Sequence, residues 1–327
     1  SVAPVNDAPV VNNSTDPLVS AIDEDDITNT GMLVRNFIVN NPGAIADVDC
    51  PSTGCDFTSD RQKLGLAIIG ADDSNGRWQY QTAVGGIWSD FGSATLSTGS
   101  ALQLAADAVT RIRFVPNTNS PGFSPNTHFN GTSTFEFHAW DQSNMATNGS
   151  RGVVTGNTGG ANAFSILSET ATITVNAVND PPVIRVAGAA SLTVLDASST
   201  FTVATSEDTD FVFQAANQQG LEVADLDVNE TASPNNVVQV SLTAMHGNVT
   251  LSTLANLDFS IANGNVGDGV TDVTMTFTGT LVDVNNALSG LRYTPDDDFN
   301  SDLGTETLTV RVSDLGHTGA PGAAVTE

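Results

Sequence analysis

The stretch that decides the fold is Ala171–Ile184, which reads A-T-I-T-V-N-A-V-N-D-P-P-V-I. Its first half alternates threonine with apolar β-branched residues, which is typical of a half-buried strand. The N-D-P-P sequence at 179–182 ends that strand, because proline lacks an N–H and fixes φ, so two prolines interrupt a hydrogen-bonded ladder. We therefore expect a strand, then a stiff acidic turn, and a new strand that begins at Val183.

The same pattern opens the chain, whose first ten residues read S-V-A-P-V-N-D-A-P-V. Asn6 and Asn179 therefore occupy equivalent places in two copies of one domain, 173 positions apart (179 − 6). We predict a first domain over residues 1–178, whose residues 1–7 are the linker end of a preceding repeat. We predict a second domain over residues 179–327, which lacks its final strand.

Further motifs recur in the same order in both halves. The pairs are E-D at 24–25 and 207–208, A-D-x-D at 46–49 and 224–227, R-x-x-P at 113–116 and 292–295, and F-N at 129–130 and 299–300. Each half also contains an alternating strand that is followed by aspartate, at Asp141 and Asp314. A shared order of motifs with different loops between them indicates repeated β-domains.

Short alternating segments separated by Gly, Asn and Pro turns run through both halves. The expected strands are 36–40, 64–69, 111–116 and 134–140, with an aromatic hairpin over 76–88. The best helical candidate is Leu281–Leu291, long enough for about three turns. The prediction is an all-β fold of two β-sandwiches in tandem.

The 327 residues carry 37 acidic and 10 basic side chains, a formal net charge of −27. This charge argues against nucleic acid as a partner, because such binding depends on Lys and Arg neutralising phosphates, and against anionic membranes. No apolar run of membrane-spanning length occurs, so we expect no membrane insertion. Self-repulsion at this charge destabilises a compact state. Either the acids are spread over a long shape, or cations bind some of them. Solubility in salty water and calcium binding are two explanations of this charge, and both can hold.

Together, the N-D-x-P linker, the E-D turn, the D-x-D pair and the strand followed by aspartate resemble cadherin-like domains. The likeness is to the tandem cadherin-like repeats of large bacterial surface proteins, and it covers nearly the whole chain. It implies seven-stranded Greek-key sandwiches, with Ca²⁺ as the cofactor between successive domains. It also implies an extracellular, cell-surface location, with neighbouring repeats or other copies of the chain as partners.

The resemblance assigns metal ligands residue by residue. At the start of the first domain it implies Asn6, Asp7, Asp47, Asp49 and Asp141. At the joint between the domains it implies Glu24 and Asp25 together with Asn179, Asp180, Asp225, Asp227 and Asp314. Glu207 and Asp208 would face a following domain. Neither half contains the L-D-R-E motif of cadherins, so we expect one or two ions per joint rather than three.

The chemistry of these residues agrees with calcium independently. Ca²⁺ takes six to eight oxygen ligands from carboxylates, amides and backbone carbonyls. Residues two apart on an extended segment, such as Asp47 and Asp49, face the same side and can grip one ion. The alternative is that each acid simply forms a turn through local hydrogen bonds.

Cys50 and Cys55 are the two cysteines, in C-P-S-T-G-C. Four intervening residues with Pro and Gly suit a small disulfide loop, which implies an oxidising, extracellular compartment. A metal site at these cysteines is the alternative, although no second Cys pair or His cluster accompanies them.

We expect no enzyme, because the four histidines are scattered and no H-E-x-x-H or G-x-S-x-G motif occurs. The predicted function is a calcium-rigidified spacer or adhesion module of a large surface adhesin or fibre.

Two alternative functions remain. Trp78, Tyr80 and Trp88 suggest a carbohydrate-binding module attached to a polysaccharide-degrading enzyme, with surface glycans as partners, because aromatic faces suit sugar stacking. The same residues fit an ordinary hairpin whose rings face the core. The chain can also be a filament subunit that assembles by strand donation.

Overall fold

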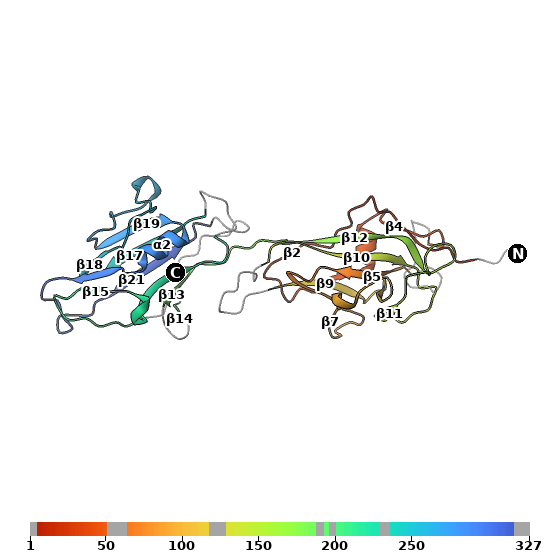
Figure 1. Cartoon of the computed structure of the whole chain (residues 1–327), viewed down its shortest axis with the longest axis horizontal. Helices are drawn as coiled ribbons and strands as arrows, with labels where there is room; N and C mark the ends of the chain where they lie inside the picture. Colours follow the sequence, from red (N-terminus) through yellow and green to blue (C-terminus); the bar gives the residue numbers. More distant parts are fainter. Residues whose placement is uncertain are drawn as a thin grey trace. The chain divides into compact units, whose positions relative to one another are not determined.

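The computed structural model describes residues 5–50, 64–117, 129–187, 193–195, 201–228 and 236–316. The chain divides into two compact units, Ser1–Ala177 and Val178–Glu327, called unit 1 and unit 2 below. Within each unit the described residues are built mainly of strands and turns (Figure 1).

The described residues of unit 1 form two large sheets and one small one. Its strands are β1 (Val10–Val11), β2 (Ile22–Asp23), β3 (Met32–Leu33), β4 (Ile45–Ala46), β5 (Gly65–Ala71), β6 (Gly76–Gln81), β7 (Ser89–Asp90), β8 (Ala101–Ala105), β9 (Arg111–Pro116), β10 (Gly131–Trp140), β11 (Arg151–Gly152) and β12 (Phe164–Asn176). A short 3-10 helix, η1, spans Ser93–Thr95. The six-stranded sheet has the order β11-β8-β5-β10-β12-β2, the four-stranded sheet β3-β9-β6-β7, and β1 pairs with β4.

The two large sheets of unit 1 share one hydrophobic core. Trp78 of β6, Phe114 of β9 and Phe135 of β10 are 1% exposed or less. The ring centroid of Trp78 lies 5.3 Å from that of Phe114 and 5.0 Å from that of Phe135. Aromatic rings at these separations bury a large apolar area and add favourable edge and offset contacts. The alternation predicted from the sequence therefore turns one face of each sheet toward this core.

One predicted strand is a helix. Residues 36–40 were expected to be extended, but Val34–Asn40 forms helix α1. Val34 and Phe37, three positions apart, are both fully buried, which is a helical spacing. The Phe37 ring centroid lies 5.8 Å from that of Phe135 and 5.7 Å from that of Phe137. Tertiary packing of Phe37 thus overrides the strand preference of the local sequence.

Unit 2 has three three-stranded sheets among its described residues. Its strands are β13 (Val183–Ala187), β14 (Thr193–Leu195), β15 (Phe211–Val212), β16 (Gly220–Ala224), β17 (Val238–Ala244), β18 (Gly247–Thr250), β19 (Thr274–Gly279), β20 (Arg292–Pro295) and β21 (Leu308–Ser313). Two 3-10 helices, η2 and η3, span Ala215–Asn217 and Ile261–Asn263. The sheet orders are β14-β13-β16, β15-β20-β18 and β19-β17-β21.

Helix α2 (Leu281–Leu288) confirms the helical spacing seen in the sequence. Thr280 caps it, since its Oγ1 accepts the N–H of Asp283 at 3.3 Å. Val284, Ala287 and Leu288 are fully buried against the core of unit 2. The helix ends three residues earlier than its apolar spacing suggested.

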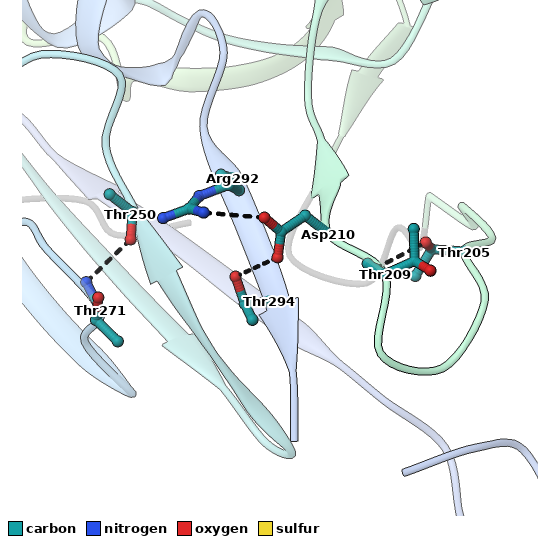
Figure 2. A network of polar contacts seen from close by, with 7 residues as sticks. All are labelled: Thr205, Thr209, Asp210, Thr250, Thr271, Arg292 and Thr294. Carbon is teal, nitrogen blue, oxygen red and sulfur yellow. Dashed lines mark hydrogen bonds and ion pairs between the residues drawn. The ribbon is translucent and has the colours of Figure 1, made fainter. Parts of the chain in front are cut away.

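A polar network fastens the segment before β15 onto β20 (Figure 2). Asp210 Oδ2 forms an ion pair with Arg292 Nη1 at 2.9 Å, and its Oδ1 accepts the hydroxyl of Thr294 at 2.6 Å. Both partners lower the pKa of Asp210, Thr294 the more strongly. The contact is on the surface, so it positions the segment more than it stabilises the fold.

The all-β prediction is confirmed for the described residues, which contain only two short α-helices. No helix among them is long and apolar enough to cross a membrane.

Candidate metal-binding sites

Three segments of unit 2 bring acidic side chains to one place. Asn179 and Asp180 precede β13, Asp225 and Asp227 follow β16, and Asp314 follows β21. Because β13 and β16 pair antiparallel, with Val183 opposite Ala224, the start of one strand lies beside the end of the other. The pairing of β13 with β16 therefore brings these acidic side chains close together.

Four hydrogen bonds fix this acidic cluster of unit 2. Asn179 Nδ2 donates to Asp314 Oδ2 at 2.6 Å, and the Gly316 N–H donates to Asp314 Oδ1 at 2.9 Å. The Asp180 N–H donates to Asp227 Oδ2. The Asp227 N–H in turn donates to Asp225 Oδ1 at 2.9 Å. These bonds orient the carboxylates of Asp225, Asp227 and Asp314 and fix the backbone of Asp180.

The carboxylates of this cluster lie away from water. Asp225 is 7% exposed, and Asp227 and Asp314 are fully buried. Burial raises the pKa of Asp225, and the charges of Asp314 and Asp180 raise it further, against two backbone N–H groups that lower it. Asp225 Oδ2 is buried and accepts no hydrogen bond from the described part of the chain. A buried carboxylate oxygen without a donor is destabilising.

Unit 1 contains the same arrangement. Asn6 and Asp7 precede β1, Asp47 and Asp49 follow its partner β4, and Asp141 follows β10. Asn6 Nδ2 donates to Asp141 Oδ2 at 2.8 Å, the Asp7 N–H to Asp49 Oδ2 at 2.8 Å, and the Asp49 N–H to Asp47 Oδ1 at 2.8 Å. Burial raises the pKa of Asp47, the hydrogen bond from the Asp49 N–H lowers it, and the charges of Asp141, Asp49 and Asp7 raise it further.

The two clusters share four equivalent hydrogen bonds. The amide-to-carboxylate bond spans 135 positions in both units, from Asn6 to Asp141 and from Asn179 to Asp314. The fourth bond is also shared, since the Ser143 N–H donates to Asp141 Oδ1 at 2.8 Å. Ten of the fourteen predicted ligands are therefore gathered into two equivalent acidic clusters, one in each unit.

The donor set suits a hard cation. Each cluster offers four carboxylates and one amide oxygen, which are the ligands that Ca²⁺ prefers, and the buried Asp225 Oδ2 is an unused acceptor. Within the described ranges, no group of three or more His, Cys, Asp or Glu side chains is already arranged to hold a metal ion. Oxygens that now accept backbone N–H groups would have to turn toward the ion.

The remaining four predicted ligands are not part of the acidic cluster of their own unit. In unit 1, Glu24 directly follows β2, and β2 pairs with the last residues of β12. Asp141 directly follows Trp140, and Trp140 pairs with the first residue of β12. β12 has 13 residues, so these positions are about 40 Å apart at roughly 3.3 Å per residue. Glu24 and Asp25 are thus at the opposite end of unit 1 from its acidic cluster.

These distant acids have repeated partners of their own. Asn130 Nδ2 donates to Glu24 Oε2 at 3.3 Å, and Asn300 Nδ2 donates to Glu207 Oε2 at 2.8 Å. Asp208 Oδ1 accepts the Asp298 N–H at 3.0 Å. The sequence shows these asparagines only as members of the repeated F-N motif. Their recurrence in the F-N motif of both halves was the signal that could have assigned them to the glutamates.

The predicted disulfide stays a prediction. Cys50 is buried at 3% exposure, next to the unit 1 cluster, and its N–H donates to the Asp47 carbonyl at 3.0 Å. Cys55 lies outside the described residues.

The aromatic residues differ from the exposed platform that the carbohydrate-binding alternative requires. Trp78 is fully buried, its ring stacks on Phe91 at 5.8 Å, and its Nε1–H donates to Ser133 Oγ at 2.9 Å. Trp78 therefore belongs to the core and offers no face to a sugar, because the β6–β7 hairpin turns that side toward the second sheet. Tyr80 and Trp88 are half-buried.

No protein-family model matches the chain, and no curated protein sequence matches it. One similar solved structure is a pre-assembly complex of a chaperone and a tip adhesion subunit, from the archaic chaperone-usher Csu pili of Acinetobacter baumannii. Its sequence is 12% identical to this one, the match covers 93% of this chain and 99% of that chain, and the TM-score is 0.31. Another is a structure reported as manganese lipoxygenase of Gaeumannomyces graminis with a partial structure of zonadhesin of Komagataella pastoris. Its sequence is 10% identical, the match covers 81% of this chain and 78% of that chain, and the TM-score is 0.19. Both TM-scores are below 0.5, so neither similarity supports a conclusion about fold or function.

Proposed function

We propose that the chain is a calcium-stabilised repeat segment of an extracellular surface protein, with a structural or adhesive rather than a catalytic role. In this proposal each unit is a cadherin-like Greek-key sandwich. The observation that supports it is the acidic cluster formed by the same four hydrogen bonds in both units. Turn-forming acids alone would not need to converge twice in the same way.

Calcium is the cation that this donor set suits best. Ca²⁺ accepts a flexible shell of six to eight oxygens, whereas Mg²⁺ demands near-ideal octahedral geometry and retains several waters. A cluster whose carboxylates come from three separate segments is more easily completed around the larger ion. Water molecules can supply the remaining ligands.

Binding would fix the segment that enters each unit. Asp180 precedes β13, while Asp225 and Asp227 belong to the body of unit 2. An ion shared by these side chains ties the entering segment to the unit and removes their mutual repulsion. The free energy of binding then appears as stability of the folded state.

An extracellular location is part of this proposal, and calcium sites of known extracellular modules agree with it. Calcium sites in extracellular modules bind with dissociation constants of about 10⁻⁴–10⁻³ M, so such sites fill outside the cell and stay empty in the cytoplasm. The same segment would be loosely held before export and rigid afterwards.

Isothermal titration calorimetry with CaCl₂ tests this proposal. We expect at least one ion per unit, with Asp225→Ala abolishing binding to unit 2 and Asp47→Ala abolishing binding to unit 1. Asp297→Asn and Asp16→Asn are matched controls, because both aspartates are exposed and make no hydrogen bond to a described residue. Binding that is equally weakened by the controls would show diffuse counterion attraction and reject the proposal.

A second candidate function is assembly by strand addition at β21. In unit 1, β10 pairs with β5 on one side and β12 on the other. In unit 2, β21 pairs with β17 on one side, and its other edge has no strand partner among the described residues. A strand from another chain can pair with an open edge of this kind through main-chain hydrogen bonds. Sedimentation velocity over a wide concentration range distinguishes the candidates, because a chain that stays monomeric throughout does not self-assemble this way.

A further inference from the structure

An open hollow of about 380 Å³ lies in unit 1, away from the acidic cluster. Pockets of this size are within the usual range for small ligands. Its lining is Thr28, Asn29, Thr30, Gln81, Gly85, Gly86, Trp88 and Arg111. These residues come from the turn before β3, the end of β6, the turn of its hairpin, and the start of β9. The hollow therefore lies along the four-stranded sheet.

Arg111 gives the hollow an unneutralised positive charge. Its Nη1 donates to the carbonyls of Thr30 at 3.0 Å and Gly31 at 2.9 Å, which fixes the guanidinium. Its Nε and Nη2 make no hydrogen bond and no ion pair with a described residue, in a chain with 37 acids and 10 bases. Nε and Nη2 share one edge of the guanidinium, the edge that binds a carboxylate through two parallel hydrogen bonds.

Trp88 and Gln81 supply the other recognition groups. Trp88 is half-buried, and the Arg113 guanidinium stacks over its ring at 4.1 Å, so the indole is held in place beside the hollow. Gln81 donates through Nε2 to the Gly86 carbonyl at 3.1 Å, while its Oε1 accepts no hydrogen bond from the described chain. Thr28 and Thr30 are exposed at the rim.

We propose that this hollow binds a hexuronate unit of an acidic polysaccharide. The carboxylate pairs with Nε and Nη2 of Arg111. The apolar face of the pyranose ring packs on Trp88, since indole combines a broad apolar surface with a polar edge. A ring hydroxyl donates to Gln81 Oε1. A simple acidic peptide would satisfy Arg111 but would leave the indole and the amide oxygen without a matching partner.

The affinity for one sugar unit is modest. A hexuronate of thirteen heavy atoms with ordinary ligand efficiency binds with a dissociation constant on the order of 1 mM. The net charge of −27 repels anionic ligands at long range. Added salt screens this repulsion, so the affinity for glucuronate should first rise with salt concentration. At higher salt the attraction between Arg111 and the carboxylate is screened as well, and the affinity falls again. Several units on one polysaccharide would raise the avidity.

Tryptophan fluorescence provides a selective readout. Of the three tryptophans, Trp78 and Trp140 are fully buried and Trp88 borders the hollow. Sodium glucuronate is titrated into the whole chain in the presence of chelator, so that calcium cannot bridge the sugar to an acidic cluster. We expect a saturable change in emission that disappears in Trp88→Phe.

Variants and competing ligands test the recognition. Arg111→Gln should weaken glucuronate binding by about tenfold or more, because it removes a charge-assisted pair, and Arg111→Lys should also weaken it because it loses the two-point geometry. Arg77→Gln, an exposed arginine outside the hollow, is the matched control and should bind as the parent does. Ligand-observed NMR of glucuronate gives a second readout that does not need Trp88.

Three outcomes would overturn the proposal. Equal binding of glucose would show that the carboxylate is not recognised, and equal binding of acetate or glutarate would show that the sugar ring is not. Unchanged glucuronate binding by both folded Arg111 variants would place the site elsewhere. None of these outcomes bears on calcium, so this proposal and the proposed function fail separately.

Discussion

Replacing Asp225 by asparagine should change the stability of unit 2 in opposite directions with and without calcium. Asp225 Oδ1 accepts the N–H groups of Asp227 and Val228, both at 2.9 Å, while the buried Oδ2 accepts none from the described chain. Asparagine keeps a carbonyl oxygen for both donors. Its neutral NH₂ replaces the charged Oδ2 and can donate to a neighbouring carboxylate.

In chelator, Asp225→Asn removes one of the charges that repel within the cluster. Relieving a buried, unsatisfied carboxylate is worth about 1 kcal/mol or more, which raises the melting temperature of a 150-residue unit by about 2–4 °C. In about 10 mM Ca²⁺, a site with a dissociation constant of roughly 10⁻⁴–10⁻³ M stabilises the parent by about 1.4–2.7 kcal/mol. The variant loses most of that stabilisation and becomes the less stable protein.

Differential scanning calorimetry in chelator and in calcium measures how Asp225→Asn changes the melting temperature of unit 2 in each condition. All three tryptophans are in unit 1, and Tyr293 is the only tyrosine of unit 2, so Trp emission follows unit 1 separately. The transition of unit 1 should not respond to Asp225→Asn, and Asp297→Asn should leave both transitions unchanged. A variant that is destabilised by the same amount in both buffers would refute the reasoning, because Asp225 would then act through its hydrogen bonds alone.

Three further predictions follow from particular contacts. In chelator, lowering the pH from about 7 toward the unfolded pKa of about 3.9 should raise the melting temperature of both units. The raised pKa values of Asp47 and Asp225 mean that the folded state binds more protons than the unfolded state. This stabilisation is complete below the unfolded pKa and is lost as the pH rises through the folded pKa, and a flat profile in calorimetry over that whole range would contradict it. Phe37→Ala should lower the free energy of unfolding of unit 1 by about 3–5 kcal/mol, as other large-to-small changes of a buried aromatic residue do. Urea unfolding followed by Trp emission measures this change, and a loss below about 1 kcal/mol would disprove the role of α1. Mass spectrometry of the unreduced protein should show Cys50 and Cys55 bonded to each other, and reduction should lower stability little because the loop is short; two free thiols would reject the pairing.

The sequence predicts most of the strands because one face of each is buried. β9 matches the expected residues 111–116, β10 begins three residues before the expected 134–140, and β5 is shifted to 65–71 from the expected 64–69. In the expected hairpin over 76–88, β6 is the first strand, but the returning strand is β7 at 89–90, just beyond the expected end. The expected strand at 36–40 is wrong. A seven-residue segment is too short for local periodicity to distinguish a helix from a strand, and the packing of Phe37 decides it.

Much of each acidic cluster was also predictable, because antiparallel pairing brings a strand start beside its partner's end. The hydrogen bonds from Asn130 to Glu24 and from Asn300 to Glu207 were missed, because the recurrence of the F-N and E-D motifs in both halves does not by itself say that the two motifs lie together. The hollow beside Arg111 was missed for a similar reason. Its lining comes from four segments, and only the folded sheet shows which tryptophan is buried.

The most direct test of the calcium sites is anomalous diffraction from crystals grown in millimolar CaCl₂. We expect anomalous difference peaks within coordination distance of Asp225, Asp227 and Asp314 in unit 2, and of Asp47, Asp49 and Asp141 in unit 1, with ligand distances of about 2.3–2.6 Å. Well-ordered acidic clusters without such peaks, at a calcium concentration well above about 1 mM, would contradict the central claim.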